Sequence, residues 1–255
     1  MTKKSRPKDM TDIETLLEKN SDICYSDKWH PTPVSYFEKA LSTDAFRGFG
    51  KETRKNIAYS IQYLEFIQKE LDELHLHNIV ETQLMKTYII TAMGIIEAIF
   101  LHLVRKSGFY KKEEWIQEKT IHTNVFKDNG IDKKYIITTS AKLKNPVEAE
   151  MDFEFLINKI QDKKLIDLNH KAFPHLKALK RIRNKVHLQI AKNGFETDYY
   201  SISKNDYLMM RYLLCIILKN KKLGTQNSTC LSFSNISTEQ VNQLKEYLKE
   251  KSAKS

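Results

Sequence analysis

The chain has 255 residues, of which 42 are Lys or Arg and 32 are Asp or Glu, so its formal net charge is +10 at pH 7. This excess favours a polyanionic partner, although a basic surface can also simply keep a protein in solution. Seven glycines and five prolines in this length predict long helices and argue against a β-sandwich or barrel. The three cysteines are widely spaced and show no metal-ligand spacing, so we expect no disulfide framework, no metal and no cofactor.

Residues 1–75 are expected to form a helical extension that packs on the flank of the remaining chain. Their first ten residues are basic, but no apolar run follows, so we expect no signal peptide and a cytoplasmic location. Short helices are predicted over residues 11–19 and 35–46. A long amphipathic helix is predicted over residues 52–74 because apolar side chains recur there at helical spacing: Ile57, Ile61, Leu64, Ile67 and Leu71.

Residues 79–105 form the most apolar part of the chain. Between Tyr88 and Val104, only Glu97 and His102 are ionisable. A membrane span needs about 20 apolar residues without such interruptions, so we expect a central core helix and no membrane anchor. An unpaired carboxylate among these apolar residues would cost several kcal/mol, and Glu97 must therefore be paired or protonated.

Residues 115–145 interrupt the helical pattern with β-branched and aromatic side chains interspersed with Thr. Asn129–Gly130 within them is a strong turn dipeptide. We expect either a β-hairpin or an irregular excursion here, inserted between core helices and closed by Pro146.

Four further helices are predicted after this insertion, over residues 151–163, 174–192, 203–219 and 237–251. Ser203 is expected to cap the third of them, and Ser237 with Gln240 matches a capping box at the start of the fourth. The polar connector at 220–234 leaves room for a short extended piece at the sequence CLSF.

Together the segments predict an all-α fold, an antiparallel helical bundle with a small β-hairpin or irregular insertion. Each helix has an apolar stripe that needs a partner, and the helix at 79–105 is apolar almost all round. The expected organisation is an N-terminal helical extension at 1–75, the bundle at 76–222 with its insertion at 115–148, and a C-terminal connector and helix at 223–255.

Residues 176–190, LKALKRIRNKVHLQI, are the most basic part of the chain. From residue 168 to residue 195 there is no Asp or Glu, but there are seven Lys or Arg and three His. At about 100° per residue, five side chains form a core-facing stripe: Leu176, Leu179, Ile182, Val186 and Ile190.

Polar side chains flank this stripe. Arg183 and His187 lie on one side of the helix at the margin of the stripe, whereas Arg181 projects nearly opposite the stripe. Lys180 and Asn184 continue round the helix from His187. A cation and an imidazole at a core boundary require an anion, which can be a buried carboxylate or a phosphate.

The segment RIRNKVH resembles the signature of the HEPN superfamily, all-helical domains found in prokaryotic toxins, antiphage systems and RNA-guided CRISPR ribonucleases. The usual pattern is an arginine, often followed by Asn, then about four to six residues and a histidine. Five residues separate Arg181 from His187, and three separate Arg183 from His187. Arg183 is the arginine that is followed by Asn. Which arginine carries the family role therefore stays open.

The resemblance also implies a partner for Glu97. Family members often carry a polar residue on their first core helix, facing the Arg–His helix, and GIIEAIF looks like that element. We therefore expect Glu97 to contact Arg183, or Arg181 if the helix is rotated.

The function implied by the resemblance is metal-independent RNA cleavage in antiphage defence or as a toxin. Sequence motifs for nucleotide binding, zinc proteolysis or α/β-hydrolase chemistry do not occur in the chain. An imidazole with a pKa near neutrality can move the 2′-hydroxyl proton, and an arginine can hold the scissile phosphate. The candidate catalytic residues are Arg181, Arg183, Asn184 and His187, supported by Glu97 and Lys180, with Lys177 and Lys185 as RNA-binding residues.

By the same resemblance, two protomers pair so that both Arg–His helices line one cleft. The expected partners are therefore RNA, a second copy of the chain, and an antitoxin or another defence-system protein. In the alternative interpretation, Arg183 pairs with Glu97 and His187 donates to a backbone carbonyl. The protein is then a non-catalytic dimerisation or nucleic-acid-binding module.

Overall fold

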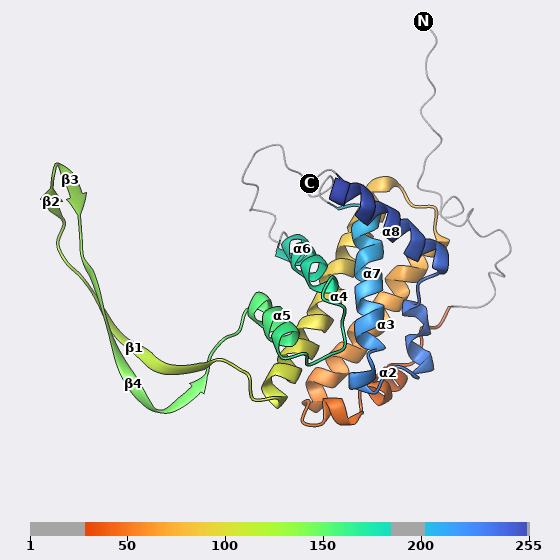
Figure 1. Ribbon diagram of the computed structural model, residues 1–255, viewed down its shortest axis with the longest axis horizontal. Coiled ribbons are helices and arrows are strands. Elements are labelled where there is room, and N and C mark those ends of the chain that lie inside the picture. The colour runs from red at the N-terminus through yellow and green to blue at the C-terminus, as the bar shows by residue number, and fades with distance from the viewer. Residues whose placement is uncertain (1–28, 185–201, 254–255) are drawn as a thin grey trace, which may run out of the picture.

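The amphipathic segments fold into helices that pack around one central helix, and a long β-hairpin projects from this bundle (Figure 1). The computed structural model describes residues 29–184 and 202–253. The helices are, in chain order, α2 (Val34–Ala40), η1 (Asp44–Phe46), α3 (Lys51–Glu73), α4 (Asn78–Lys106), α5 (Phe153–Asp162), α6 (Ala172–Asn184), α7 (Lys204–Leu218), η3 (Lys221–Leu223), η4 (Thr229–Ser234) and α8 (Thr238–Ala253). The strands are β1 (Lys112–His122), β2 (Phe126–Asp128), β3 (Ile131–Lys133) and β4 (Ile136–Glu148). The fold is therefore mainly α-helical.

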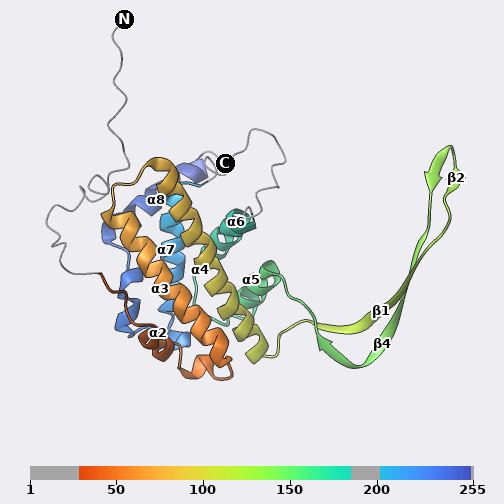
Figure 2. The same cartoon turned by 180° about the vertical axis from the view of Figure 1, so that it is seen from behind.

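Helix α4 is the centre of the bundle. It packs against α3, α5, α6 and α7, and Figure 2 shows it running between α3 on one side and α5 and α6 on the other. Eight of its apolar side chains have no solvent exposure: Tyr88, Ile89, Ala92, Met93, Ile96, Ile99, Phe100 and Val104. Among the described residues it is the one helix long and apolar enough to cross a membrane, and most of that stretch is buried inside the protein. Its burial is that of a core helix.

The N-terminal helices share this core. In α3, the side chains of Ile61, Leu64 and Ile67 are fully buried against the bundle. Phe37 of α2 belongs to the same hydrophobic cluster. The predicted helix at 11–19 lies outside the described residues.

One helix near the N-terminus differs from its prediction. A continuous helix over 35–46 was expected, but α2 ends at Ala40, and the short 3₁₀ helix η1 follows. The chain is extended at Thr43, whose hydroxyl donates a hydrogen bond to the carbonyl oxygen of Leu223 at 2.5 Å. The prediction was wrong because this break depends on a contact with a residue 180 positions away.

The C-terminal helices begin as their capping signals predict. Ser203 and Asp206 form a reciprocal capping box at the start of α7. Ser237 and Gln240 exchange two hydrogen bonds of 3.1 Å at the start of α8. The extended piece expected at CLSF is wrong, because these residues lie in the 3₁₀ helix η4, where Leu231 is buried in the core.

The insertion is a β-hairpin, and it is longer than expected. β1 and β4 pair antiparallel, and β2 and β3 pair beyond them at the tip. Asn129 and Gly130 connect β2 to β3 with φ angles of 50° and 79°, and such paired positive values are what a tight hairpin turn requires. Pro146 does not close the insertion, since it lies inside β4, where the register shifts between the pairs Glu113–Val147 and Trp115–Lys142.

Candidate functional site

Helix α6 positions the described candidate residues. Leu176, Leu179 and Ile182 are buried, so the core-facing stripe lies where the sequence predicts it. The helix as described ends at Asn184, which is exposed. Lys185 and His187 lie outside the described residues, as do the last two members of the predicted stripe.

The carboxylate of Glu97 meets Arg183, as expected from the sequence. The Nη2 atom of Arg183 donates to Oε2 of Glu97 at 2.6 Å, joining α6 to the central helix α4. The Arg183 side chain is 36% exposed and that of Glu97 is 25% exposed. The ion pair therefore lies at the edge of the core, where water reaches both side chains.

Lys180 forms a second link that the sequence did not indicate. Its Nζ donates to Oε2 of Glu154 in the first turn of α5, at 3.0 Å. Lys180 is largely covered, whereas the Glu154 side chain is 55% exposed. The two residues lie on different helices and no local pattern connects them, so only the packing of α5 against α6 reveals the pair.

Arg181 differs from both of these cations. It is exposed on the outer side of α6, and no side chain in the described ranges 29–184 and 202–253 pairs with it. Lys177 is one turn before it and half-buried, and Asn184 is one turn after it, so the three side chains lie along the same side of the helix. This part of α6 offers hydrogen-bond donors to solvent without a carboxylate beside them in the sequence.

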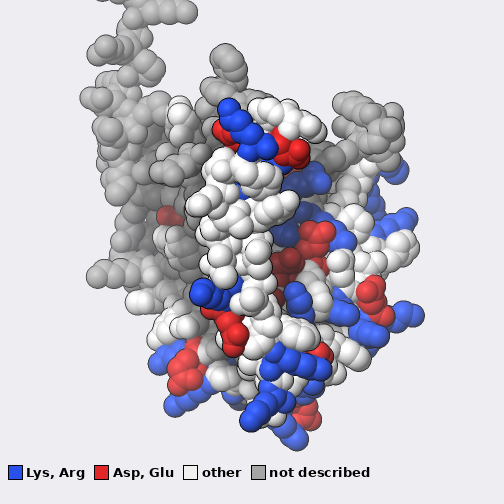
Figure 3. All heavy atoms as spheres, turned by 90° about the vertical axis from the view of Figure 1, so that its left-hand side faces the viewer, with Lys and Arg blue, Asp and Glu red and all other residues white. Residues whose placement is uncertain are grey.

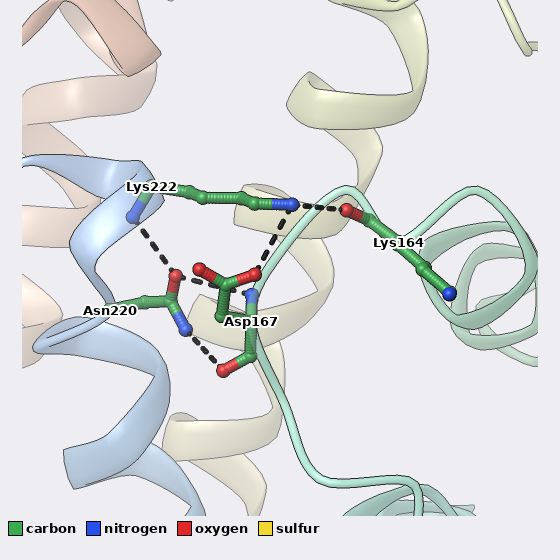
Figure 4. A network of polar contacts seen from close by, with 4 residues as sticks. All are labelled: Lys164, Asp167, Asn220 and Lys222. Atoms are coloured by element: carbon green, nitrogen blue, oxygen red, sulfur yellow. Dashed lines mark hydrogen bonds and ion pairs between the residues drawn. The ribbon is translucent and has the colours of Figure 1, made fainter.

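A polar network around the buried amide of Asn220 holds the connector that leads into α6 (Figure 4). Asn220, only 5% exposed, donates from its amide nitrogen to the carbonyl oxygen of Asp167 at 2.9 Å and accepts from the backbone N–H of Lys222 at 3.1 Å. The Nζ of Lys222 donates to the carbonyl oxygen of Lys164 at 2.6 Å and lies 3.3 Å from the Asp167 carboxylate. The connector is thereby tied to the end of α7, which fixes where α6 begins.

The positive charge of the chain is concentrated around this helix and after it. Residues 151–255 hold 19 Lys or Arg and 10 Asp or Glu, whereas residues 1–150 hold 23 and 22. Nearly all of the net charge therefore belongs to the part of the chain that includes α5, α6 and the C-terminal helices. Figure 3 shows the side from which the hairpin projects, where Lys and Arg atoms are spread over much of the surface with Asp and Glu atoms between them.

A surface cleft near the end of α4 is the other place where cations gather. It is lined by Arg47, Phe49, His102 and Arg105, among others. Its cations are already partnered, because Arg47 pairs with Asp44 at 2.8 Å and Arg105 pairs with a carboxylate at the base of the hairpin. The cleft is therefore less suited to an anionic ligand than the outer side of α6.

The imidazole of His102 has a structural role beside this cleft. It is 8% exposed, its Nε2 lies 3.0 Å from the carbonyl oxygen of Ala45, and its ring lies 4.6 Å from that of Phe49. Burial lowers the pKa of His102, with a smaller contribution in the same direction from the neighbouring Lys106 and Arg105. The N–H at Nε2 therefore holds η1 against α4.

Among the described residues, no group of three or more His, Cys, Asp or Glu could hold a metal ion.

Fold and site together define a mainly α-helical protein with a β-hairpin arm and a surface helix that has basic but no acidic residues. Comparison of the chain with protein-family models, with curated proteins and with solved structures gave no match. Any function must therefore be argued from the chain's own residues.

Proposed function

We propose that the protein is a metal-independent endoribonuclease of the HEPN type, acting in antiphage defence or as a toxin. The observation that supports this most is the contact between Glu97 and Arg183. It connects the polar position of the central helix to the Arg–His segment, as the resemblance to that family implies. The surplus of positive charge in residues 151–255 suits a nucleic-acid partner.

The geometry favours different roles for the two arginines. Arg183 is held by a carboxylate, so it orients α6 on the central helix. Arg181 is exposed and has no partner among the described residues, so its guanidinium is available to bind a phosphate through two N–H groups. Counted from Arg181, the spacing to His187 also agrees with the family pattern.

In the proposed reaction, His187 of one copy takes the proton of the ribose 2′-hydroxyl, and His187 of a second copy gives a proton to the leaving 5′-oxygen. The 2′-oxygen attacks the adjacent phosphorus, and the bond to the 5′-oxygen breaks. The products are a 2′,3′-cyclic phosphate and a 5′-hydroxyl. Arg181 stabilises the charge that develops on the phosphate, and Asn184 orients the phosphate or the imidazole. Lys177 and Lys185 contribute contacts to the RNA backbone.

A second function is favoured by a specific observation. Two of the cations of α6, Lys180 and Arg183, are neutralised by Glu154 and Glu97 within the protomer. Such pairing also suits a helix that stabilises the bundle and takes no part in catalysis. The alternative is therefore a non-catalytic module for dimerisation or nucleic-acid binding.

Cleavage of RNA by the purified full-length protein, with and without EDTA, tests the proposal. We expect cleavage that EDTA does not affect and 2′,3′-cyclic phosphate ends. We expect His187→Ala to abolish cleavage and leave RNA binding largely intact. Arg181→Ala should lower the rate about 100-fold or more without a change in thermal stability, because it removes a donor to the developing charge. Arg183→Ala should lower both the rate and the stability.

Arg47→Ala is the matched control, since Arg47 is an exposed arginine far from α6 in the chain, and it should cleave like wild type. A His187→Ala protein that cleaves at the wild-type rate would contradict the proposed mechanism. A wild-type protein that forms dimers but cleaves no RNA would favour the interaction module.

A further inference from the structure

The β-hairpin is a solvent-exposed arm. It leaves the bundle between the end of α4 and the start of α5 and extends away from it on the side that carries α5 and α6 (Figures 1 and 2). All residues of β1 and β4 are exposed or half-exposed. Among residues 29–184 and 202–253 these strands pair only with each other, so no described residue covers either face of the two-stranded ribbon.

One face of the ribbon is the more apolar. Residues that pair across the strands share a face, and residues two apart on an unbulged strand share it as well. Positions 135, 137, 139 and 141 therefore lie on one face, opposite Ile121, Lys119 and Ile116 of β1, because a bulge between Gln117 and Lys119 keeps Ile116 and Ile121 on the same side. The pair Lys119–Thr139 is the polar part of this face. The four large side chains of this set are 44% to 64% exposed: Ile116, Ile121, Tyr135 and Ile137.

The opposite face is more polar. Its central pairs are Thr120–Thr138 and Gln117–Ser140, with Trp115 and Ile136 towards its ends. A two-stranded hairpin alone is only marginally stable in water, and three strands or a packing partner are usually needed. The more apolar face is therefore the part of this arm best suited to a packing partner.

The net charge of the arm indicates that its partner is not RNA. Residues 111–150 hold eight Lys and seven Asp or Glu, so the arm is almost neutral. A surface that binds nucleic acid needs a cluster of cations, because affinity depends on neutralised phosphates. The arm therefore differs from α6 in both charge and exposed chemistry, and a protein surface fits it better.

We propose that the arm clasps a second copy of this chain through the face formed by Ile116, Ile121, Tyr135 and Ile137. With 11 residues in β1, the arm is ~36 Å long, close to the ~43 Å of the 29-residue helix α4, so it can span a bundle of this size. This inference goes beyond the proposed function and holds whether or not α6 cleaves RNA.

The area supports a reciprocal arrangement. A ribbon ~36 Å long and ~10 Å wide covers ~350 Å², so one arm packed on a partner buries ~700 Å² in total. Two arms bury ~1,400 Å², which lies within the range of stable dimers, whereas one arm alone falls below it. A two-fold dimer in which each copy gives and receives one arm leaves no arm open and does not extend into a filament.

The test is the oligomeric state of the full-length protein, measured by analytical ultracentrifugation across micromolar concentrations. Wild type is expected to be a dimer. The double variant Ile121→Lys/Ile137→Lys should weaken dimerisation about 100-fold or more, because it places two ammonium groups in the apolar contact. Thr120→Lys/Thr138→Lys adds the same charges to the neighbouring cross-strand pair on the other face, and it should remain a dimer.

Circular dichroism should show an intact helical bundle in both variants, since the arm is outside the core. A monomeric wild type, or an Ile121→Lys/Ile137→Lys protein that dimerises like wild type, would overturn the inference. Equal loss in the two double variants would overturn the assignment of the face. If the arm bound RNA instead, the added lysines would strengthen RNA binding and leave the oligomeric state unchanged.

The same proteins separate this inference from the proposed function. If Ile121→Lys/Ile137→Lys is monomeric and wild type cleaves no RNA, dimerisation through the arm is supported and the ribonuclease proposal fails. If the monomeric variant cleaves RNA at the wild-type rate, dimerisation through the arm is again supported, and a catalytic cleft between two copies is wrong.

Discussion

The bundle and the arm contain similar apolar side chains and differ in what surrounds them. Ile96 on α4 has no solvent exposure, whereas Ile137 on β4 is 52% exposed. In the described part of the chain, helix α4 has four helices packed around it, whereas β4 pairs only with β1. Burial therefore follows from the availability of a packing surface, and the arm has no such surface among the described residues.

The two regions also differ in how their ends are attached. The connector before α6 is tied down by Asn220, a buried amide with several hydrogen bonds. The base of the arm is held at the surface, where Nε of Arg105 donates to Glu148 at 2.5 Å and the backbone N–H of Ala149 donates to the carbonyl oxygen of Lys111 at 2.9 Å. Changes in the bundle should therefore affect global stability, and changes in the arm should affect association.

The largest expected effect comes from replacing an isoleucine in the bundle, compared with an isoleucine in the arm. Ile96→Ala should lower the free energy of unfolding by about 2–5 kcal/mol, because it leaves a cavity in the centre of the core. Ile137→Ala, on the arm, should change it by less than about 0.5 kcal/mol. Urea denaturation followed by helical circular dichroism, at a concentration where the protein is monomeric, measures both. Similar losses in the two variants would show that the arm folds back onto the bundle.

The network at Asn220 should have a smaller effect than a cavity in the core. Asn220→Ala should destabilise the bundle by about 1 kcal/mol, since it removes a buried amide and leaves the carbonyl of Asp167 and the N–H of Lys222 without their partner. Hydrogen exchange should show faster opening of the connector before α6. Lys222→Ala, which removes a half-exposed side chain from the same network, is the milder comparison. Equal stability of Asn220→Ala and wild type would mean that the connector is not held by this amide.

The pair of Glu97 and Arg183 should have a smaller effect than a fully buried pair. Removing one partner of a buried pair costs about 3–5 kcal/mol, but these side chains are 25% and 36% exposed, so Glu97→Ala should cost about 1–2 kcal/mol. Glu97→Gln should be milder because it keeps an acceptor for Arg183. Glu154→Ala, which breaks the more exposed pair with Lys180, should cost less than about 0.5 kcal/mol. A melting temperature unchanged by Glu97→Ala would contradict a stabilising role for this contact.

The smallest effect concerns pH. Burial lowers the pKa of His102 in the folded protein, so below its ordinary pKa of about 6.5 the unfolded chain binds more protons than the folded one. The stability contributed by the neutral imidazole is therefore complete above that pH and is lost as the pH falls. His102→Gln should show a weaker loss of stability between about pH 7.5 and about pH 5.5 than wild type. Parallel pH profiles would rule out a contribution from this histidine.

Local signals predicted much of the helical framework. Apolar periodicity placed α3, α4, α5 and α7 close to their observed bounds, and the capping residues Ser203 and Ser237 lie where α7 and α8 begin. These features depend on side chains within one or two turns of each other. The end of α2 and the conformation of CLSF were wrong because each depends on contacts with distant residues. The hydroxyl of Thr43 reaches Leu223, and Phe233 packs its ring on Phe37 at 6.2 Å.

The candidate site was predictable in part for the same reason. A carboxylate on an apolar helix requires a partner or a proton, and the resemblance to the HEPN family implied Arg183 or Arg181 as the partner of Glu97. The link between Lys180 and Glu154 had no such signal, since both are ordinary charged residues on amphipathic helices. The exposure of Arg181, which distinguishes it from Arg183, agrees with the rotation of the helix inferred from its apolar stripe.

The sequence by itself determined most of the helical segments, the tight turn at Asn129–Gly130 and the need of Glu97 for a partner or a proton, because each follows from short-range spacing or from the cost of an unpaired charge. Only the tertiary structure decided that the cation is Arg183, that Lys180 is tied to α5, and that the hairpin extends into solvent. Alternation of apolar and polar residues specifies a strand and its two faces. It does not specify what covers them, because that depends on surfaces that the chain brings together only when it folds.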